Sequence, residues 1–363
     1  MLSRVITPWA AVVMGVMGIA MLLAMLLTML MVVSGCDRTA DDGGVLVVYS
    51  AGPRGLAEAV CRAFSEESGV RIELFSATSG QIMAKLEAEK YNPRADVVVL
   101  ASQFGAEWLK RERRLLAYVP MAVETTVPQW HDPDGFYHAT SAAAVGIAVH
   151  ADFHHDALEW SDFFNGHFPG RAIMPAPSRS GSSADFVLSY LLAHSDRGWA
   201  DFSAARSHGL EIAGANSQAI TNLLIGSHHA VFGAVDYLIL REVARGEPIV
   251  MHFPDSGAAL VRRPIAILST TRVPELAKNF VDFYFDESAQ QEIAARHLLP
   301  ARTDVAVSDV RAGTPLSREM IADMDDAMAH QRTILRRFQY EIERAVIPPP
   351  ADPDRTPARE TLP

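Results

Sequence analysis

The stretch Val45-Leu46-Val47-Val48-Tyr49-Ser50-Ala51-Gly52-Pro53 decides how this chain folds. It holds a continuous apolar run, then a small-residue turn, and then a proline where a helix from 53 to about 67 is expected. An uninterrupted apolar run predicts a strand that is buried on both faces, as in a parallel sheet covered by helices. Further strands are predicted at 70–75 and 95–100, and further helices at 80–90 and from 104. Strands that alternate with helices predict an α/β fold with a mainly parallel sheet.

A second block of the same kind follows the polar loop at residues 131–135. The apolar patterns predict strands at 143–149, 172–174, 229–235 and 264–268, and helices at 183–194, 217–225, 274–285 and 287–296. Residues 316–345 are charged and amphipathic, which predicts one long helix. The last residues, 346–363, are rich in proline and charge and hold little to bury, so they are expected to be disordered.

Serine-bearing turns follow several of the predicted strands. The start of a helix exposes unpaired backbone N–H groups and the positive end of the helix dipole, and a serine adds a hydroxyl. In a parallel sheet such turns gather at the carboxyl edge, where they predict a cradle for an oxyanion. Serine is also a common helix cap, so it is the repetition of the turns that favours a site. The turns are Ser50-Ala51-Gly52, Ser79-Gly80, Ala101-Ser102, Ser180-Gly181-Ser182 and Asn216-Ser217, and Tyr237 follows a further strand.

The N-terminus has the parts of a secretory signal. Arg4 is followed by an uncharged stretch from Trp9 to Val33, and small residues precede Cys36. This arrangement resembles the lipobox of bacterial lipoproteins, which implies that residues 1–35 are removed and that Cys36 is acylated. Residues 36–44 then form a flexible, lipidated tether. An uncleaved transmembrane helix is the alternative, and both interpretations place the rest of the chain outside the cytoplasm.

The composition narrows the range of functions. The chain has 363 residues and a net charge of −11, which disfavours a nucleic-acid partner. With Cys36 acylated, only Cys61 remains, so no disulfide framework is expected. Cys61 lies beside a helical apolar stripe and is interpreted as a small buried residue. The sequence contains no Walker loop, nucleophile elbow or dinucleotide fingerprint, so neither an enzyme nor a cofactor is expected.

Several motifs occur in an order that resembles a known family. The motifs at 47–52, 95–102, 177–182 and 264–267 are similar to those of periplasmic solute-binding proteins of ABC importers. The branch resembles ferric-ion-binding proteins and, in its first third, molybdate-binding proteins. The resemblance implies a two-lobed type II periplasmic-binding-protein fold with two hinge crossings. The first lobe would comprise residues 45–137 and then 263–345 with the C-terminal helix, and the second lobe residues 138–262.

The same resemblance implies a set of ligand contacts: Ser50, Ala51, Ser79, Gly80, Ser102, Ser180, Gly181, Ser182, Ser217 and Tyr237. Ferric-binding relatives offer two adjacent tyrosines where this chain has Asp236-Tyr237-Leu238. Because Fe³⁺ prefers several anionic oxygen ligands, one phenol disfavours bare iron. No metal site is expected, except that Tyr237 becomes a metal ligand if the solute is ferric.

The sequence therefore predicts a lipoprotein on the periplasmic face of the cytoplasmic membrane. It would capture a small anionic or metal-containing ligand, such as an oxyanion, a phosphonate or a ferric complex, for an ABC permease in the inner membrane. A ligand-sensing partner of a membrane receptor with the same fold is the alternative. A membrane-anchored hydrolase using Ser180 or Ser182 is a third hypothesis, although no base is visible in the sequence.

Overall fold

The structure, a computed structural model, describes residues 44–316, 318–320 and 323–345. The chain divides into two units, residues 1–44 and 45–363, and the fold below is that of the second unit. The predicted signal peptide, Cys36 and the predicted C-terminal tail lie outside the described residues. Among the described helices, none has the length and apolarity needed to cross a membrane.

The first part of this unit alternates strands and helices. The apolar run at Val45 forms the central strand of three, because it pairs in parallel with a strand on each side. The elements are β1 (Val45–Ser50), α2 (Arg54–Ser68), β2 (Arg71–Ser76), α3 (Ser79–Ala88), β3 (Val97–Val99), α4 (Gln103–Arg111) and β4 (Leu115–Leu116). Two 3₁₀ turns, η1 (Val123–Thr125) and η2 (Pro128–Trp130), follow.

The middle part repeats the pattern around a second set of three parallel strands, β7, β6 and β8. Its elements are β5 (His138–His150), η3 (Ala151–Phe153), α5 (Trp160–Phe164), β6 (Ala172–Met174), α6 (Gly181–Ser207), β7 (Glu211–Ile212), α7 (Asn216–Leu224), β8 (Ala230–Val235), α8 (Asp236–Ala244) and β9 (Ile249–His252). The chain then continues through β10 (Ala259–Leu268), α9 (Pro274–Phe285), α10 (Glu287–Ala295), β11 (Leu299–Pro300), α11 (Asp309–Ala312), α12 (Met324–Phe338) and a π-helical turn, η4 (Gln339–Glu343).

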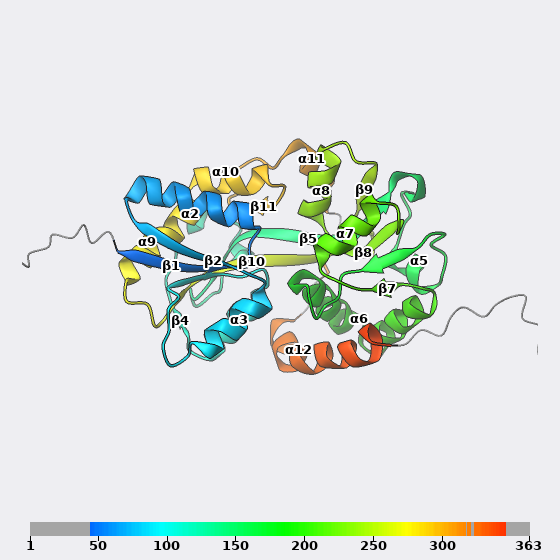
Figure 1. Cartoon of the computed structure of the whole chain (residues 1–363), viewed down its shortest axis with the longest axis horizontal. Coiled ribbons are helices and arrows are strands. Elements are labelled where there is room, and N and C mark those ends of the chain that lie inside the picture. Colours follow the sequence, from blue (N-terminus) through cyan, green and yellow to red (C-terminus); the bar gives the residue numbers. More distant parts are fainter. Residues whose placement is uncertain (1–43, 317, 321–322, 346–363) are drawn as a thin grey trace, which may run out of the picture. The chain divides into compact units, whose positions relative to one another are not determined.

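All described strands belong to one sheet with the order β2-β1-β3-β10-β5-β8-β6-β7; in addition, β4 pairs with β10, and β9 and β11 pair with β5. The long strands β5 and β10 are antiparallel to each other and connect the two parallel sets, as Figure 1 shows. We call the half with β1, β2, β3, α2, α3, α4, α9 and α10 the first lobe, and the half with β6, β7, β8 and α5 to α8 the second lobe. This arrangement confirms the predicted two-lobed α/β fold.

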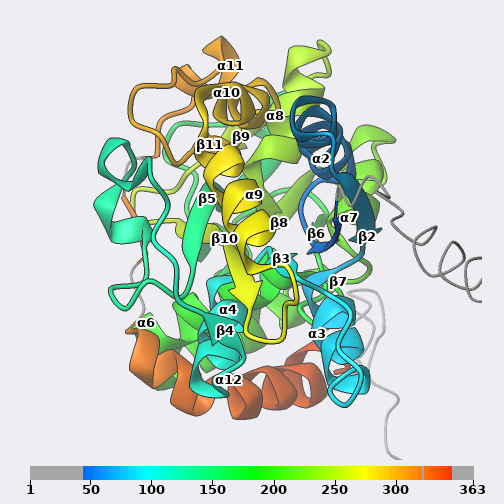
Figure 2. The same ribbon diagram turned by 90° about the vertical axis from the view of Figure 1, so that its left-hand side faces the viewer.

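Helices cover both faces of the sheet in each lobe. In the first lobe, α2, α9 and α10 bury one face, and α3 and α4 bury the other (Figure 2). In the second lobe, α5 and α6 cover one face, and α7 and α8 cover the other. Because the strands are buried on both sides, their sequences are continuously apolar, and burial of that surface stabilises each lobe.

Two helices differ from the expected ones. The helix that starts near residue 183 continues to Ser207 and contains a kink at Ser195, where φ is 50°. The C-terminal helix begins at Met324 and not at residue 316, because residues 318–320 extend beside β10. There, the amide of Ala258 donates to the carbonyl of Arg318 at 2.9 Å, and the amide of Met320 donates to the carbonyl of Ala258 at 2.8 Å. Asp323 then caps α12 by accepting the amide of Asp326.

Candidate ligand-binding site

A cleft of about 230 Å³ lies between the two lobes, where the turns after their strands meet. The first lobe supplies Ala51, Thr78, Ser79 and Ala101. The second lobe supplies Arg179, Ser180, Gly181, Ser182, Ala215, Asn216, Ser217, Val235, Tyr237 and Leu238, and β10 supplies Arg263. The cleft therefore joins residues that are more than 200 positions apart in the sequence.

Seven of the ten predicted contact residues line this cleft: Ala51, Ser79, Ser180, Gly181, Ser182, Ser217 and Tyr237. The other three, Ser50, Gly80 and Ser102, are not among the lining residues. Ser50 is buried, and its hydroxyl accepts the amide of Gly52 at 3.1 Å. The Ser102 hydroxyl instead donates to Asp185 Oδ1 at 2.8 Å.

The wall from the first lobe is held by hydrogen bonds between neighbouring strand ends. Thr78 caps α3 together with Gln81, which fixes the turn after β2. Ser79 Oγ accepts the amide of Ala101 at 3.0 Å, which ties this turn to the one after β3. The start of α3 is therefore oriented toward the cleft by two separate strands.

The wall from the second lobe is organised by Asn216, which the sequence analysis did not count among the contacts. The Ser180 hydroxyl donates to Asn216 Oδ1 at 2.9 Å, and Asn216 Nδ2 donates to Ser182 Oγ at 2.9 Å. One amide therefore orients two hydroxyls at the start of α6. Its position at the start of the neighbouring helix, α7, is the sequence signal that identifies it.

The floor of the cleft holds Arg263, which the sequence analysis also missed. Its residue surface is only 4% exposed, and one guanidinium nitrogen donates to the carbonyl of Ala51 at 3.0 Å. Among the described residues, no carboxylate oxygen lies within 4.0 Å of the Arg263 guanidinium, so Arg263 forms no ion pair with them. A buried cation is rare without an anionic partner, so the charge of Arg263 is available to a ligand.

Two other arginines, Arg54 and Arg179, lie next to the predicted serine-bearing turns. Arg179 lines the cleft at its exposed rim. Arg54, in contrast, is exposed on α2 and pairs with Glu58 at 2.7 Å. Only one of these two turn arginines therefore lies at the cleft.

Tyr237 is positioned from beneath by a buried ion pair. Asp236 is fully buried, lies 2.8 Å from Arg311, and accepts the amides of Ala144 and Tyr237 at 2.7 and 2.6 Å. Burial raises the pKa of Asp236, and Arg311 and the two amides oppose that rise. The Tyr237 ring lies beside Arg263, with 5.8 Å between the guanidinium carbon and the ring centroid.

The electrostatic character of the cleft follows from these groups. Its lining includes two arginines and neither an aspartate nor a glutamate. The first turns of α3, α6 and α7 add backbone amides and the positive ends of three helix dipoles. The lobes face each other closely, because a Cβ built at Gly181 would lie 3.9 Å from Ser79 Oγ. This inventory suits an oxyanion, since it combines hydroxyl, amide and guanidinium donors.

A metal ion fits the described residues less well. No group of three or more His, Cys, Asp and Glu side chains that would hold a metal occurs in the described parts of the chain. Tyr237 is the only phenol among the lining residues, and Arg263 would repel a bare cation.

Comparisons with known proteins identify the family of the chain. The family model described as bacterial extracellular solute-binding protein matches residues 45–297. The probable ABC transporter periplasmic-binding protein y4fP of Sinorhizobium fredii is 23% identical over 316 residues, which cover 82% of this chain and 87% of that protein.

Solved structures share the fold. The periplasmic binding protein AfuA from Actinobacillus pleuropneumoniae, with exogenous fructose-6-phosphate bound, has a TM-score of 0.74 and 21% identity, covering 83% of this chain and 99% of that one. The ferric binding protein from Campylobacter jejuni has a TM-score of 0.71 and 18% identity, covering 80% and 98%. The chain therefore belongs to the bacterial extracellular solute-binding protein family and is a periplasmic solute-binding protein of the ABC-importer type.

Proposed function

We propose that the protein captures a small solute that carries a phosphate or a similar oxyanion group and delivers it to an ABC permease. The observation that carries this proposal is Arg263, a buried guanidinium that faces a cleft lined by hydroxyls and helix starts. Each charge-assisted hydrogen bond to such a group is worth about 1.5–3 kcal/mol, which exceeds the worth of a neutral bond.

The ligand class follows from charge and from size. A cleft of about 230 Å³ has room for an oxyanion together with a small organic part. The fructose-6-phosphate of the AfuA structure, a phosphate ester, is a ligand of this kind. A ferric complex remains within the proposal only where an anionic chelator contacts Arg263, because the cleft lining offers a single phenol.

The mechanism is capture and not catalysis. Contacts from both lobes to one ligand favour the closed arrangement, which the permease then recognises. Ser180 and Ser182 bond to the Asn216 amide, which cannot serve as a general base for a hydrolase.

A thermal-unfolding panel tests the ligand class. The full chain is measured with inorganic phosphate, molybdate, 2-aminoethylphosphonate, fructose 6-phosphate and ferric citrate. A ligand at 100 times its Kd adds about 2.7 kcal/mol to the free energy of unfolding, which raises Tm measurably. We expect a shift with at least one of the phosphorus or molybdenum oxyanions. A shift with ferric citrate alone that Arg263→Gln leaves unchanged would contradict the proposal and indicate that Tyr237 is an iron ligand.

We also propose that Cys36 carries the lipid that anchors the protein to the membrane. The proposal rests on the small residues Ser34 and Gly35 after an uncharged leader. Cells fed a palmitate analogue should label the wild-type chain and not Cys36→Ser, and the mature chain should begin at Cys36. A mature chain that retains residues 1–35 would contradict this anchor and support an uncleaved helix.

A further inference from the structure

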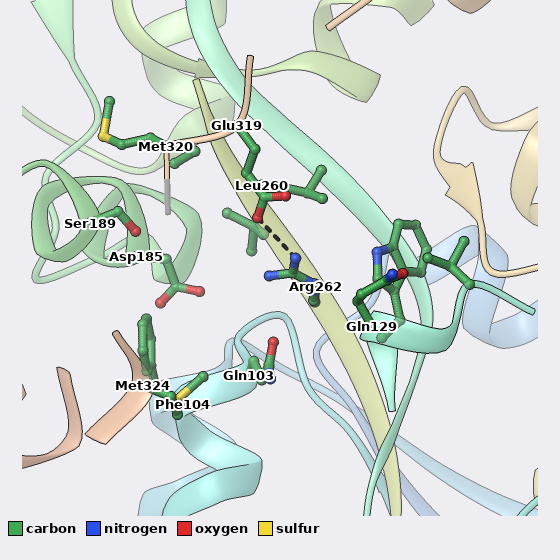
Figure 3. A pocket seen from close by; sticks show the side chains of 14 residues that line it. Gln103, Phe104, Gln129, Asp185, Ser189, Leu260, Arg262, Glu319, Met320 and Met324 are labelled. Atoms are coloured by element: carbon green, nitrogen blue, oxygen red, sulfur yellow. Dashed lines mark hydrogen bonds and ion pairs between the residues drawn. The ribbon is translucent and has the colours of Figure 1, made fainter. Parts of the chain in front are cut away.

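A second cavity lies beside β10, and Figure 3 shows the residues that line it. Arg262 and Arg263 are consecutive on β10, and consecutive strand residues face opposite sides of a sheet. Arg263 lines the cleft, whereas Arg262 lines this rear cavity of about 360 Å³ and pairs with Glu319 at 2.9 Å. The walls of the rear cavity come from both lobes, since Gln103 belongs to α4 and Ser189 belongs to α6.

Asp185 lies at the wall of the rear cavity, and its carboxyl connects the lobes. It is buried on α6 in the second lobe, and it accepts the hydroxyl of Ser102 at 2.8 Å. Ser102 precedes α4 in the first lobe and is buried as well. The bond therefore joins side chains that are 83 residues apart and belong to different lobes.

Both partners adjoin residues of the ligand cleft. Ser102 directly follows Ala101, which lines the cleft and donates its amide to Ser79. Asp185 lies one helical turn after Gly181 and Ser182, which line the cleft from the other lobe. The rigid first turn of α6 therefore carries cleft contacts at its start and the interlobe bond immediately behind them.

We propose that Asp185 is a positioning residue for ligand capture, because its bond to Ser102 holds the lobes together behind β10 and so sets the separation of the two cleft walls. The effect on the affinity for an oxyanion rests on the proposed function, whereas the effect on the separation of the lobes does not.

The charge state of Asp185 makes a sharp test possible. Burial raises the pKa of this carboxyl to about 8, although the Ser102 bond and the nearby Arg263 oppose the rise. The other charged groups of the rear cavity are Arg262 on β10 and Glu319 on the C-terminal segment. At neutral pH Asp185 is therefore mainly neutral, so asparagine reproduces both its shape and its acceptor oxygen, whereas alanine removes the acceptor.

The separation of the lobes is measured by pulsed electron paramagnetic resonance on the full chain in detergent. Cys36 is replaced by serine, and spin labels are placed at Tyr91→Cys in the first lobe and Ile225→Cys in the second, positions that are 96% and 69% exposed. Without ligand, we expect Asp185→Ala to move the distance distribution to longer values and Asp185→Asn to keep the wild-type distribution. Asp201→Ala is the matched control, because Asp201 accepts a hydrogen bond from Tyr190 at 2.8 Å inside the second lobe, across the kink at Ser195.

Binding of inorganic phosphate supplies the second readout. We expect Asp185→Ala to weaken the binding of inorganic phosphate about 10-fold. The double variant Ser102→Ala/Asp185→Ala should bind no more weakly than Asp185→Ala, since both substitutions remove the same hydrogen bond. A wild-type distance distribution in Asp185→Ala, or an equal shift in Asp201→Ala, would overturn the proposal. The distances test Asp185 whether or not the wild type binds inorganic phosphate, so a failure of the proposed ligand class remains distinguishable from a failure of this proposal.

Discussion

Single residues decide the charge that a ligand meets in this protein. Arg262 and Arg263 differ by one position and face opposite sides of β10, so one pairs with Glu319 and the other faces the cleft. Asp185 is the nearby acid, but it makes no ion pair within 4.0 Å of Arg263 among the described residues. Because burial keeps this acid mainly neutral near pH 7, it leaves the charge of Arg263 largely uncompensated.

The raised pKa of Asp185 predicts how stability depends on pH. Between the ordinary value of 3.8 and about 8, the carboxyl is protonated in the folded state and ionised in the unfolded state. The folded state then binds more protons, so this group lowers the free energy of unfolding as pH rises through that window. Urea unfolding of Asp185→Asn and of the wild type is measured at pH 5 and pH 8. The free energy of unfolding of Asp185→Asn, relative to that of the wild type, should be higher at pH 8 than at pH 5. A difference in the free energy of unfolding that is the same at both pH values would contradict the raised pKa of Asp185.

At this scale the sequence predicted part of the site. The serines at helix starts were identifiable because their turns follow buried strands, and Ser79, Ser180 and Ser182 do line the cleft. The same pattern also selected Ser50 and Ser102, because a turn motif does not show which way a hydroxyl points. Arg263 was missed because it lies inside a strand, where the face it occupies depends on register.

Among the elements, α12 connects the C-terminal segment to both lobes. Ala327 is fully buried in a cluster with Phe104 of α4 and Leu188 of α6. Arg111 of α4 also pairs with Asp325 at 2.6 Å. The sequence favoured packing on the first lobe alone, but Phe338 and Ile342 join the core of the second lobe. The amphipathic pattern of α12 indicated that one face of the helix is buried, but it did not specify which lobe covers that face.

Ala327→Glu tests this packing. A carboxylate placed at a fully buried position costs more than about 2 kcal/mol unless the helix undocks. We therefore expect faster hydrogen exchange over residues 324–343 and a lower urea midpoint. Thr333→Glu introduces the same side chain on the exposed face of α12 and should leave both quantities near the wild-type values. Equal effects of the two substitutions would contradict the packing described here.

At the scale of the whole molecule, two α/β blocks were predictable because each repeats the strand–helix pattern of Val45–Ser68, whereas the hinged two-lobed arrangement was implied by the family resemblance. The ligand was not predictable, since it depends on contacts from α3, α6, α8 and β10 that meet only after folding. One protein with this fold binds fructose-6-phosphate in its solved structure and another is a ferric binding protein, so the fold alone leaves the ligand open.

Isothermal titration calorimetry tests the central claim, that Arg263 makes this cleft an anion site. The full chain is titrated with fructose 6-phosphate and with inorganic phosphate, as wild type, Arg263→Gln and Arg54→Gln. We predict that at least one of the two binds the wild type, that Arg263→Gln weakens that binding roughly 10- to 100-fold, and that Arg54→Gln, on the exposed surface of α2, leaves it unchanged. Equal affinity in the wild type and Arg263→Gln, or binding of neither anion by the wild type, would contradict the account.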